Sequence, residues 1–575
     1  MFLKYSERKS NGKTYKYYNI VEGVRVDGKV KHNILFPLGT LSDEKASQIR
    51  EILKVGTTSD SSTKLYKLSD VVVAKSNDFL NIYVLHQLWC EWELDKIFRD
   101  YPYIEKLVIN RCINPMSKYR AALWEDGELV DMLNLRRNGE PFGTYRELGR
   151  IDEQTEQLQS HLSTLMRDRN MLSDQAIIYD ITSTYFEKTK CTLAFRGYSR
   201  DNRPDKLQIV IAMAVTSEGY PFYWKVYEGN KNDVSTVKDF SNMITKLFGV
   251  TNFVFVFDRG MVSQDNIDYI EQEGYRFISA VDRDEIKTKT PVELVQFQGV
   301  DESNHRERLQ NFEKYDENLW YRVYHDAGYR YIIGFSPKKQ LEERIARSAR
   351  RDKLTQSIEQ MNQSLSCAKR DRSKQALERE LYALLKKSKI KRAVDISIED
   401  LIIQGSKKQI QSYRVNYSFN NEALDEIALP DGLTCFYTNT TSDDFNACQV
   451  IRQYRDKNVV EEGFHEIKGL IELRPLYLSR KERVRAHVTI CVLAYLLWNT
   501  LERRVAHRIK LSVADILTEL AKCKMNMLTV PFSTDYHQTL TLFTQTQKEV
   551  LQHLNIPLKS VEKHFRKLMA TEKPN

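Results

Sequence analysis

The chain has 575 residues, of which 41% are hydrophobic and 29% are charged, with only 13 Pro and 22 Gly. This composition excludes a chain that is disordered overall, and the length predicts roughly three to five folded units. The longest nearly unbroken apolar run, Val488 to Trp498, is shorter than the ~20 residues that cross a bilayer, so we expect no membrane insertion.

The first residues and the cysteines indicate the compartment. The start, MFLKYSERKSNGK, lacks an apolar stretch followed by a small-residue cleavage site, so no secretory signal is expected. The eight cysteines form no CxxC pair, which argues against a zinc site and a disulfide framework. We therefore expect a cytoplasmic protein. The net charge of +9 is modest and becomes informative only where it is concentrated.

The N-terminal region predicts a small β and α module. Residues 14–38 contain two β-rich runs around Asp27-Gly28, a pair that favours a tight hairpin turn. Ser42 is suited to cap a helix that Gly56 ends, and the Ser/Thr/Asp-rich stretch 57–63 reads as a linker.

The pattern from about 76 to 172 is helical. Asn114-Pro115 and Glu140-Pro141 interrupt the apolar periodicity, so we expect breaks between helices at both places. This part of the chain is predicted to be a mostly α-helical module.

The next stretch changes to short apolar runs. We expect strands at 175–180, 207–215 and 220–229 with a turn at Ser217-Glu218-Gly219, then a helix at 233–248, a strand at 253–258, a helix at 263–273 and a strand at 275–281. The predicted order is β-β-β-α-β-α-β. A mixed sheet that begins with a three-strand meander and continues through βα units is the layout of a ribonuclease-H-like core, so the predicted fold class is α/β.

Residues 285–445 break this rhythm and are interpreted as a β-rich and helical insertion. Within it, residues 338–392 carry 17 Lys and Arg against 7 Asp and Glu, a net charge of +10. This segment is either a solvated amphipathic helix or an arm that faces DNA phosphates. An imperfect apolar stripe predicts one long helix or an antiparallel pair, and consists of Leu341, Ile345, Leu354, Ile358, Met361 and Leu365, followed by Leu377, Leu381 and Leu384.

Two aspartates follow buried strands of the predicted core. Asp180 ends the apolar run 176–179, and Asp258 ends the run 253–257. In the expected fold the first and fourth strands are neighbours, so the two carboxylates would meet at adjacent strand ends, where oxygen ligands suit Mg²⁺. Taken singly, an Asp at a strand end more often serves in a turn or as a cap than as a metal ligand.

A third acidic residue lies in the helical segment 446–470. At 100° per residue, a span of about 60° on one helical face holds Tyr454, Lys457, Glu461 and Lys468. A face that mixes an aromatic, two cations and a carboxylate is a poor core face. From spacing alone, a surface ladder of ion pairs is the alternative.

These residues resemble the Y-(2)-R-(3)-E-(6)-K signature of the insertion-sequence-four superfamily of DDE transposases, with Lys457 in place of the Arg. The stretches FRGYSRDNRPDKLQIVIAMAV, YEGNKND (227–233), FDRGMVS (257–263) and GLIELRPLYLSRKERVRAHVTICVLAYLLW resemble its branch with a long β-rich insertion between the second Asp and the Glu. The resemblance covers roughly residues 14–560. Lys457 lacks the planar fork with which Arg grips phosphate, so that contact is expected to be weaker or differently placed.

The resemblance implies that Asp180, Asp258 and Glu461 are catalytic ligands of two Mg²⁺ ions, for which Mn²⁺ can substitute. The implied reaction is two-metal phosphoryl transfer: hydrolysis of a strand at the element's end, then attack of the freed 3′-hydroxyl on target DNA. Tyr454, Lys457 and Lys468 are implied to bind DNA phosphates. His465 is interpreted as a surface histidine beside the site.

The expected organisation has six parts. They are a DNA-contacting hairpin and helix module (1–68), an α-helical module that binds DNA ends (69–172), the first part of the core (173–284), the insertion (285–445), the second part of the core with the Glu helix (446–505), and a helical C-terminal region for dimerisation (506–575). The expected partners are double-stranded DNA, at the element's terminal inverted repeats and at the target, and a second copy of the chain in a paired-end complex. A prokaryotic, nucleoid-associated protein is expected.

Two alternatives remain open at this point. The first is a metal-dependent nuclease with the same core that cuts DNA without joining it. The second is a DNA-binding repressor derived from a transposase, in which the acidic residues are idle.

Overall fold

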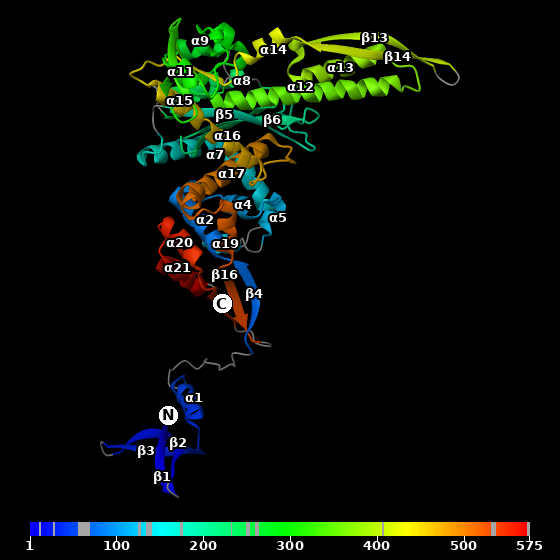
Figure 1. The fold of residues 1–575 in the computed structure, drawn as a ribbon. Helices are drawn as coiled ribbons and strands as arrows, with labels where there is room; N and C mark the ends of the chain where they lie inside the picture. Colours follow the sequence, from blue (N-terminus) through cyan, green and yellow to red (C-terminus); the bar gives the residue numbers. More distant parts are fainter. Residues whose placement is uncertain are drawn as a thin grey trace. The chain divides into compact units, whose positions relative to one another are not determined.

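The computed structural model describes residues 1–10, 13–26, 29–55, 70–124, 128–133, 141–172, 176–231, 233–248, 253–258, 264–404, 408–530 and 536–571. The chain divides into two compact units. The first comprises Met1–Ser76 and Met525–Thr541, and the second comprises Asn77–Lys524 and Leu542–Asn575. Figure 1 gives the element labels that are used below.

The first unit begins with a three-stranded antiparallel sheet and one helix. These elements are β1 (Phe2–Ser10), β2 (Lys13–Val26), β3 (Lys29–Thr40) and α1 (Asp43–Val55). The predicted hairpin is confirmed as β2–β3, and the Ser42 side chain accepts a hydrogen bond from the Lys45 amide at the start of α1. The sequence prediction missed β1, whose mostly polar residues lack an apolar run. The Asp27-Gly28 turn, Gly56 and the 57–63 linker lie outside the described residues.

A second sheet in this unit joins segments from the two ends of the chain. Its order is β17-β16-β4, with β4 (Val72–Asp78), β16 (Lys524–Thr529) and β17 (Tyr536–Leu540). The C-terminal region, which was predicted to be helical, therefore also contains the two strands β16 and β17. The short, partly exposed strands β16 and β17 carry no buried apolar run from which a strand could be predicted.

The region between 80 and 168 is helical, as predicted. It contains α2 (Leu80–Glu91), α3 (Leu94–Ile97), α4 (Pro102–Ile113), α5 (Lys118–Ala122), α6 (Glu128–Leu133) and α7 (Pro141–Asp168). The predicted breaks are confirmed where they are described: α4 ends just before Asn114-Pro115, and Pro141 is the first residue of α7. Glu140 lies outside the described residues.

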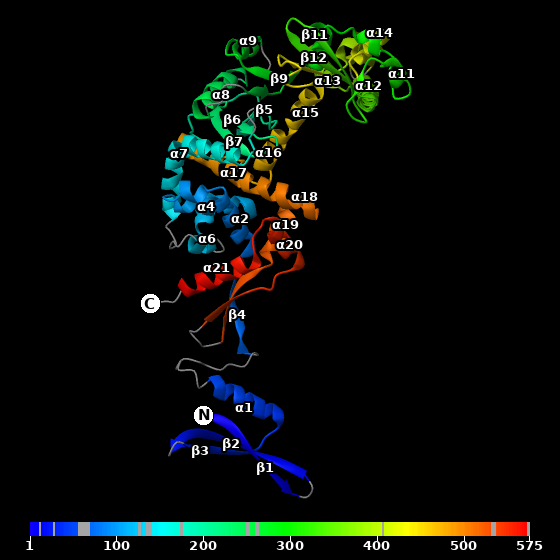
Figure 2. The same ribbon diagram turned by 90° about the vertical axis from the view of Figure 1, so that its left-hand side faces the viewer.

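The helix α17 (Lys481–Leu501) forms the centre of the second unit. It packs against β7 and α7 on one side and against α4 and α2 on the other (Figure 2). Lys481–Ile509 is long and apolar enough to cross a membrane, but 94% of its most apolar window is buried inside the protein. The apolar sequence of α17 therefore serves the core.

The C-terminal helices, of which two contact α2, pack into the second unit. They are α18 (His507–Ile509), α19 (Val513–Ala521), α20 (Gln545–His553) and α21 (Leu558–Thr571). The Phe79 and Phe565 rings meet edge to face with centroids 5.8 Å apart, and Tyr83 Oη is 2.7 Å from His564 Nδ1. These contacts join the two ends of the second unit into one core.

The large sheet of the second unit begins in the predicted order β-β-β-α-β-α-β. Its elements are β5 (Ala176–Tyr185), β6 (Gln208–Val215), β7 (Pro221–Glu228), α8 (Asp233–Phe248), β8 (Val254–Val256), α9 (Gln264–Gln272) and β9 (Arg276–Ala280). The strands β5, β6 and β7 form an antiparallel meander, and β5, β8 and β9 run parallel. Gly219 has φ +86° in the turn between β6 and β7, a conformation that glycine adopts without strain.

The following region extends the same sheet. The added strands are β10 (Glu313–Lys314), β11 (Trp320–Asp326), β12 (Tyr329–Phe335) and β15 (Leu433–Thr438), which give the nine-stranded order β10-β11-β12-β15-β9-β8-β5-β6-β7. The short helices α10 (Ile286–Lys289) and α11 (His305–Arg308) precede them. Residues 285–445 were predicted to form an insertion. Some of their strands belong instead to the core sheet, because β15 pairs with β9.

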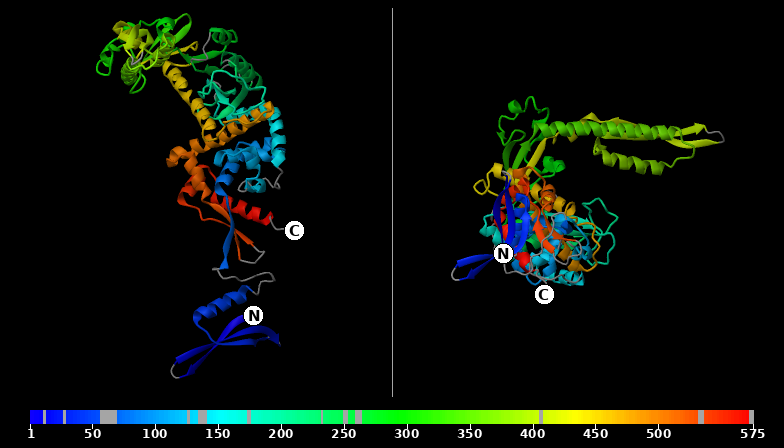
Figure 3. Two further views of the ribbon diagram at one scale, coloured as in Figure 1. Left: turned by 90° about the vertical axis from the view of Figure 1, so that its right-hand side faces the viewer. Right: turned by 90° about the horizontal axis from the view of Figure 1, so that it is seen from below.

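An arm projects from this sheet between β12 and β15 (Figure 3). It consists of α12 (Pro337–Ser366), α13 (Lys374–Ser388), β13 (Val394–Gln404), β14 (Gln409–Phe419) and α14 (Asn421–Ala428). Of the two predicted forms, the pair of helices is observed. Leu354, Ile358 and Leu365 pack with Leu377, Leu381 and β14 in one buried cluster, whereas Leu341 and Ile345 are exposed.

Candidate active site

Asp180 lies in the middle of β5, where the sequence predicted a strand end. The parallel pairing with β8 covers only Ala176–Ile178, but the pairing with β6 continues to Tyr185. Asp180 is therefore beyond the end of β8 on one side while its backbone remains paired with β6 on the other. This half-open position lets a carboxylate stand in mid-strand without entering the core.

Asp258 follows β8 directly after the buried Phe257. Its side chain is 42% exposed. Because β5 and β8 are parallel neighbours, both aspartates lie at the same edge of the sheet. Residues 259–263, which include the start of the predicted helix 263–273, lie outside the described residues.

The predicted helix 446–470 is divided into two. The helix α15 (Ala447–Asp456) begins with a capping box between Asn446 and Gln449, and α16 (Asn458–Lys468) ends before Gly469. Lys457 stands at the junction with helical dihedral angles (φ −53°, ψ −30°), so the chain continues in nearly the same direction. The helix α16 packs on β5 and β6, which brings Glu461 to the sheet edge that carries the aspartates.

Lys457 connects two of the three predicted carboxylates. Its Nζ lies 3.5 Å from Asp258 Oδ1 and donates a hydrogen bond to Glu461. Tyr454 Oη donates to Asp258 Oδ1 at 3.4 Å. The Lys457 side chain is only 6% exposed, so a buried cation holds two carboxylates at the surface of the site.

Charge and burial change the pKa values of this group. Burial raises the pKa of Asp180 to about 7; a hydrogen bond from the Ile181 backbone and the charge of Lys457 oppose that shift, and the nearby Asp258 and Glu461 add to it. Burial alone would lower the pKa of Lys457. The hydrogen bond to Glu461 and the negative charge of Asp258 outweigh that effect, so the pKa of Lys457 is raised.

One cavity of 410 Å³ brings these residues together. The three predicted carboxylates all line it, and the complete lining is Asp180, Ile181, Thr182, Arg200, Asp201, Asp258, Glu461, Phe464, His465 and Lys468. Two further predicted residues, Tyr454 and Lys457, contact Asp258 beside this cavity. His465 is exposed on its wall, as interpreted from the sequence.

The lining of this cavity also contains part of an ion cluster that the sequence did not predict. Lys468 Nζ is 2.8 Å from Asp201 Oδ1, and Arg474 Nη1 is 2.6 Å from the same oxygen. The Asp201 side chain is 4% exposed. Burial lowers the pKa of Lys468 despite the nearby Asp201 charge. In the polar stretch YSRDNRPDK, Asp201 reads as a turn residue, and only its buried position distinguishes it from Asp205.

The donor set fits a hard divalent cation, although the carboxylates are not gathered into a coordination sphere. Among the described residues, no three His, Cys, Asp or Glu side chains lie close enough to hold a metal ion. The physical reason is visible in the contacts, since Lys457 occupies the position between Asp258 and Glu461. Carboxylate oxygens on one cavity are nevertheless the ligands that Mg²⁺ and Mn²⁺ prefer.

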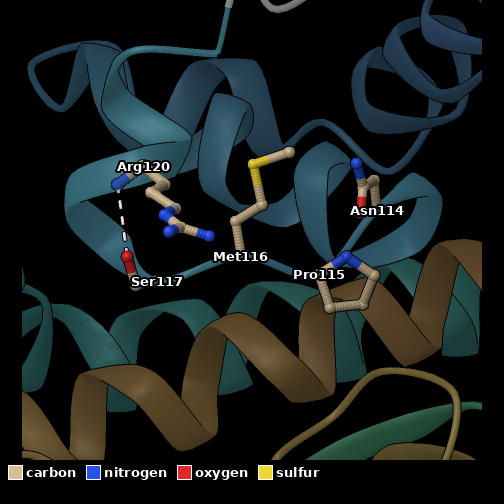
Figure 4. A pocket seen from close by; sticks show the side chains of 5 residues that line it. All are labelled: Asn114, Pro115, Met116, Ser117 and Arg120. Atoms are coloured by element: carbon tan, nitrogen blue, oxygen red, sulfur yellow. Dashed lines mark hydrogen bonds between the residues drawn. The ribbon is translucent and has the colours of Figure 1, made fainter.

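A second cavity, of 470 Å³, lies between α4 and α5 (Figure 4). Its lining is Asn114, Pro115, Met116, Ser117 and Arg120. Ser117 accepts a hydrogen bond from the Arg120 amide and so caps α5. This lining contains no carboxylate, and its polar groups serve the local helix start.

Comparisons with known proteins identify the family of the chain. The family model described as "Transposase DDE domain" matches residues 172–497, which is more than half of the chain and includes all three carboxylates. The model described as "IS1634 family transposase, N-terminal domain" matches residues 3–61. A search of curated proteins finds no match. A DDE domain implies an enzyme that transfers nucleotidyl groups, and the chain belongs to the DDE transposases.

Proposed function

We propose that this transposase moves its element by cutting and pasting DNA, and that it belongs to the insertion-sequence-four superfamily. The spacing of Tyr454, Lys457, Glu461 and Lys468 supports the superfamily. The strand order β7-β6-β5-β8-β9, with β8 and β9 parallel to β5, supports a ribonuclease-H-like core. On this proposal the arm 337–428 is the insertion of that core.

The observation that carries the proposal is the shared cavity. Asp180 and Glu461 lie 281 positions apart in the sequence with Asp258 between them, yet all three residues line one cavity of 410 Å³. We assign these carboxylates as the catalytic ligands of two Mg²⁺ ions, with Mn²⁺ as a substitute. When bound, the ions would lower the pKa of the attacking water or 3′-hydroxyl and stabilise the leaving oxygen.

The chain's own residues prepare this site. Lys457 neutralises Asp258 and Glu461 in the absence of metal and keeps both side chains on the same cavity. Tyr454 orients Asp258 through its hydroxyl. Asp180, with a pKa of about 7, must release its proton before it serves as a metal ligand, so the competent form accumulates above neutral pH.

DNA phosphates would approach the part of the cavity lining that Asp201 and Lys468 form. Lys468 is expected to contact DNA there, because Lys468 and Arg474 place two positive charges around the single carboxylate of Asp201. Lys457 and Tyr454 are proposed to reach the DNA only when the carboxylates release them. The partners on this proposal are double-stranded DNA at the element ends and the target, and a second copy of the chain that holds the other end.

A single assay tests the function. Short duplexes copied from the DNA that flanks the gene are incubated with the protein and Mg²⁺, and the products are examined for strand cleavage and for joining to a plasmid. The proposal requires both products, and it requires their loss in Asp180→Ala, Asp258→Ala and Glu461→Ala while duplex binding survives. Cleavage without joining would instead identify a nuclease, and full activity in any of the three variants would refute the assignment.

A further inference from the structure

The N-terminal sheet has two chemically different faces. The helix α1 covers one of them, where Leu3, Tyr18 and Ala46 form a small buried cluster. Tyr18 Oη also donates to Asp43 Oδ1 of α1 at 3.5 Å. Leu3 pairs with Ile20 across β1 and β2, and Tyr5 pairs with Tyr18, so these side chains define the α1 side of the sheet.

The alternate residues point to the other face. Their cross-strand pairs are Lys4 with Asn19, Ser6 with Tyr17, and Arg8 with Tyr15. His32 of β3 joins them through its contacts with Phe2 and Lys4. We define the outer sheet face as the six residues Phe2, Lys4, Arg8, Tyr15, Tyr17 and His32.

Aromatic rings and cations alternate on the outer sheet face. The Arg8 guanidinium lies 5.9 Å from the centroid of the Tyr17 ring, and Lys4 Nζ is 2.8 Å from His32 Nδ1. The Phe2 ring meets His32 edge to face at 5.1 Å. Phe2, Tyr15 and Tyr17 are all at least 40% exposed. A monomer gains nothing from leaving this many rings in water, which indicates a surface for a partner.

The charge of the module lies on the sheet. Residues 1–40 contain eight Lys and Arg against three Asp and Glu, a net charge of +5, whereas residues 43–55, which form α1, contain three of each. A basic face with interspersed aromatics is complementary to a polyanion and not to an apolar or cationic partner.

We infer that the outer sheet face binds duplex DNA with its strands lying in the major groove. The inference rests on the proposed function, since it makes this face a reader of the element's ends. Three strands spaced ~4.8 Å apart form a ribbon about 10 Å wide, which fits a major groove about 12 Å wide. Lys4 and Arg8 would contact phosphates, while the hydroxyls of Tyr15 and Tyr17 would reach base edges.

Single-stranded DNA fits this face less well. Stacking of bases needs open ring faces, but Arg8 already covers Tyr17, and Phe2 is engaged by His32. The rings of Tyr17 and His32 contact the Arg8 and Lys4 side chains at the surface of the sheet. This arrangement favours the regular phosphate spacing of a duplex.

The test measures DNA binding by the full-length protein in EDTA, so that no cleavage intervenes. The probes are fluorescent duplexes copied from the DNA flanking the gene, a duplex of shuffled sequence, and the corresponding single strands. The double variant Lys4→Ala/Arg8→Ala is expected to bind the flanking duplex at least tenfold more weakly and to lower the slope of log K against log salt by about two. Tyr17→Phe is expected to reduce the preference for the flanking over the shuffled duplex.

The matched control removes the same charge from the other side of the module. Lys45 and Arg50 are exposed on α1, so Lys45→Ala/Arg50→Ala is expected to bind like the wild type. Equal losses in the two double variants, or a loss confined to single strands, would overturn the inference. The variant Arg8→Lys keeps the positive charge and should bind the flanking duplex more tightly than Lys4→Ala/Arg8→Ala. This partial recovery separates the loss of a DNA contact from a loss of folding.

The same preparations distinguish the inference from the proposed function. If the wild type cleaves and joins DNA with Mg²⁺ but Lys4→Ala/Arg8→Ala binds the flanking duplex normally, the outer sheet face is not the reader and the proposed function stands. If the wild type binds through this face but never cleaves, the proposed function fails and the inference stands.

Discussion

Lys457 Nζ lies 3.5 Å from Asp258 Oδ1 while it donates a hydrogen bond to Glu461, so one buried ammonium group holds both carboxylates. The ammonium occupies the place in which a divalent ion would neutralise the same oxygens. Entry of a metal therefore requires Lys457 to give up at least one of these contacts.

Replacing Lys457 by Met tests this role. Without metal, the two half-exposed carboxylates repel each other, and the free energy of unfolding is expected to fall by about 1–2 kcal/mol. Mg²⁺ should then raise the melting temperature more than it does in the wild type. Arg455→Ala is the control, because Arg455 lies two residues away and pairs with the remote, exposed Asp316. Equal responses of both variants to Mg²⁺ would contradict the role.

Replacing Asp180 by Asn should stabilise the metal-free protein. The pKa of Asp180 is about 7 in the fold against 3.8 in the unfolded chain, so ionisation costs stability, and this cost grows as the pH rises from about 4 to 7. Asn carries no charge. At pH 8 the gain is expected to be about 2–4 kcal/mol, and it should shrink as the pH falls toward 4. Thermal melts in EDTA across this range measure it; a gain independent of pH would contradict the assigned cause.

The affinity for Mg²⁺ should depend on whether Asp180 is protonated. Below pH 7 the metal must displace a proton from Asp180, so the apparent affinity is expected to rise up to tenfold per pH unit and to level off above about pH 7. Calorimetric titrations between pH 5.5 and 8.5 measure both the affinity and the proton released. A flat profile would show that Asp180 is not a ligand.

Asp201 should be important for stability although it lies outside the three carboxylates. Asp201→Ala leaves Lys468 and Arg474 without their common anion in a buried place, and the expected cost is about 3 kcal/mol. Asp205→Ala, four residues along the same loop, removes an exposed carboxylate paired with Arg203 and should change stability far less. Urea unfolding compares the two; similar costs would refute the buried role.

Gly463 sets the distance between the Glu461 helix and the core. A Cβ at this position would lie 2.8 Å from Tyr495 Oη and 2.9 Å from the ring carbon that bears it. Gly463→Ala is expected to cost about 1–3 kcal/mol and to weaken Mg²⁺ binding, because α16 must shift. Gly149→Ala in α7 meets open space and should stabilise by about 0.5–1 kcal/mol. Opposite signs in the two melts are the expected result.

The sequence predicted the part of the fold that local patterns specify. The apolar runs of β6, β7, β8 and β9 and the helical period of α8 fall within a residue or two of their predicted bounds. The extent of β5 was missed because Thr182 and Ser183 look like the end of a strand. They are buried by the pairing of β5 with β6, a contact between distant segments that no local pattern contains.

The candidate site was predictable to the same degree. The helical face with Tyr454, Lys457 and Glu461 could be calculated from spacing, and all three residues are found at or beside one cavity. The partner of Lys468 could not be predicted, because Asp201 lies 267 residues away in a loop whose burial depends on the complete fold. A strand was expected at 433–440, where β15 lies, but the places of β12 and β15 in the sheet could not be predicted, since they are set by pairing alone.

The arm between β12 and β15 begins and ends at one cross-strand pair of residues. Phe335 and Leu433 are direct cross-strand partners, so almost one hundred residues depart from and return to points that a short turn would connect. A chain that lacked the arm would still form the sheet in the same register. The arm can therefore differ in length or be absent without a change in the strand register that positions Asp180 and Asp258.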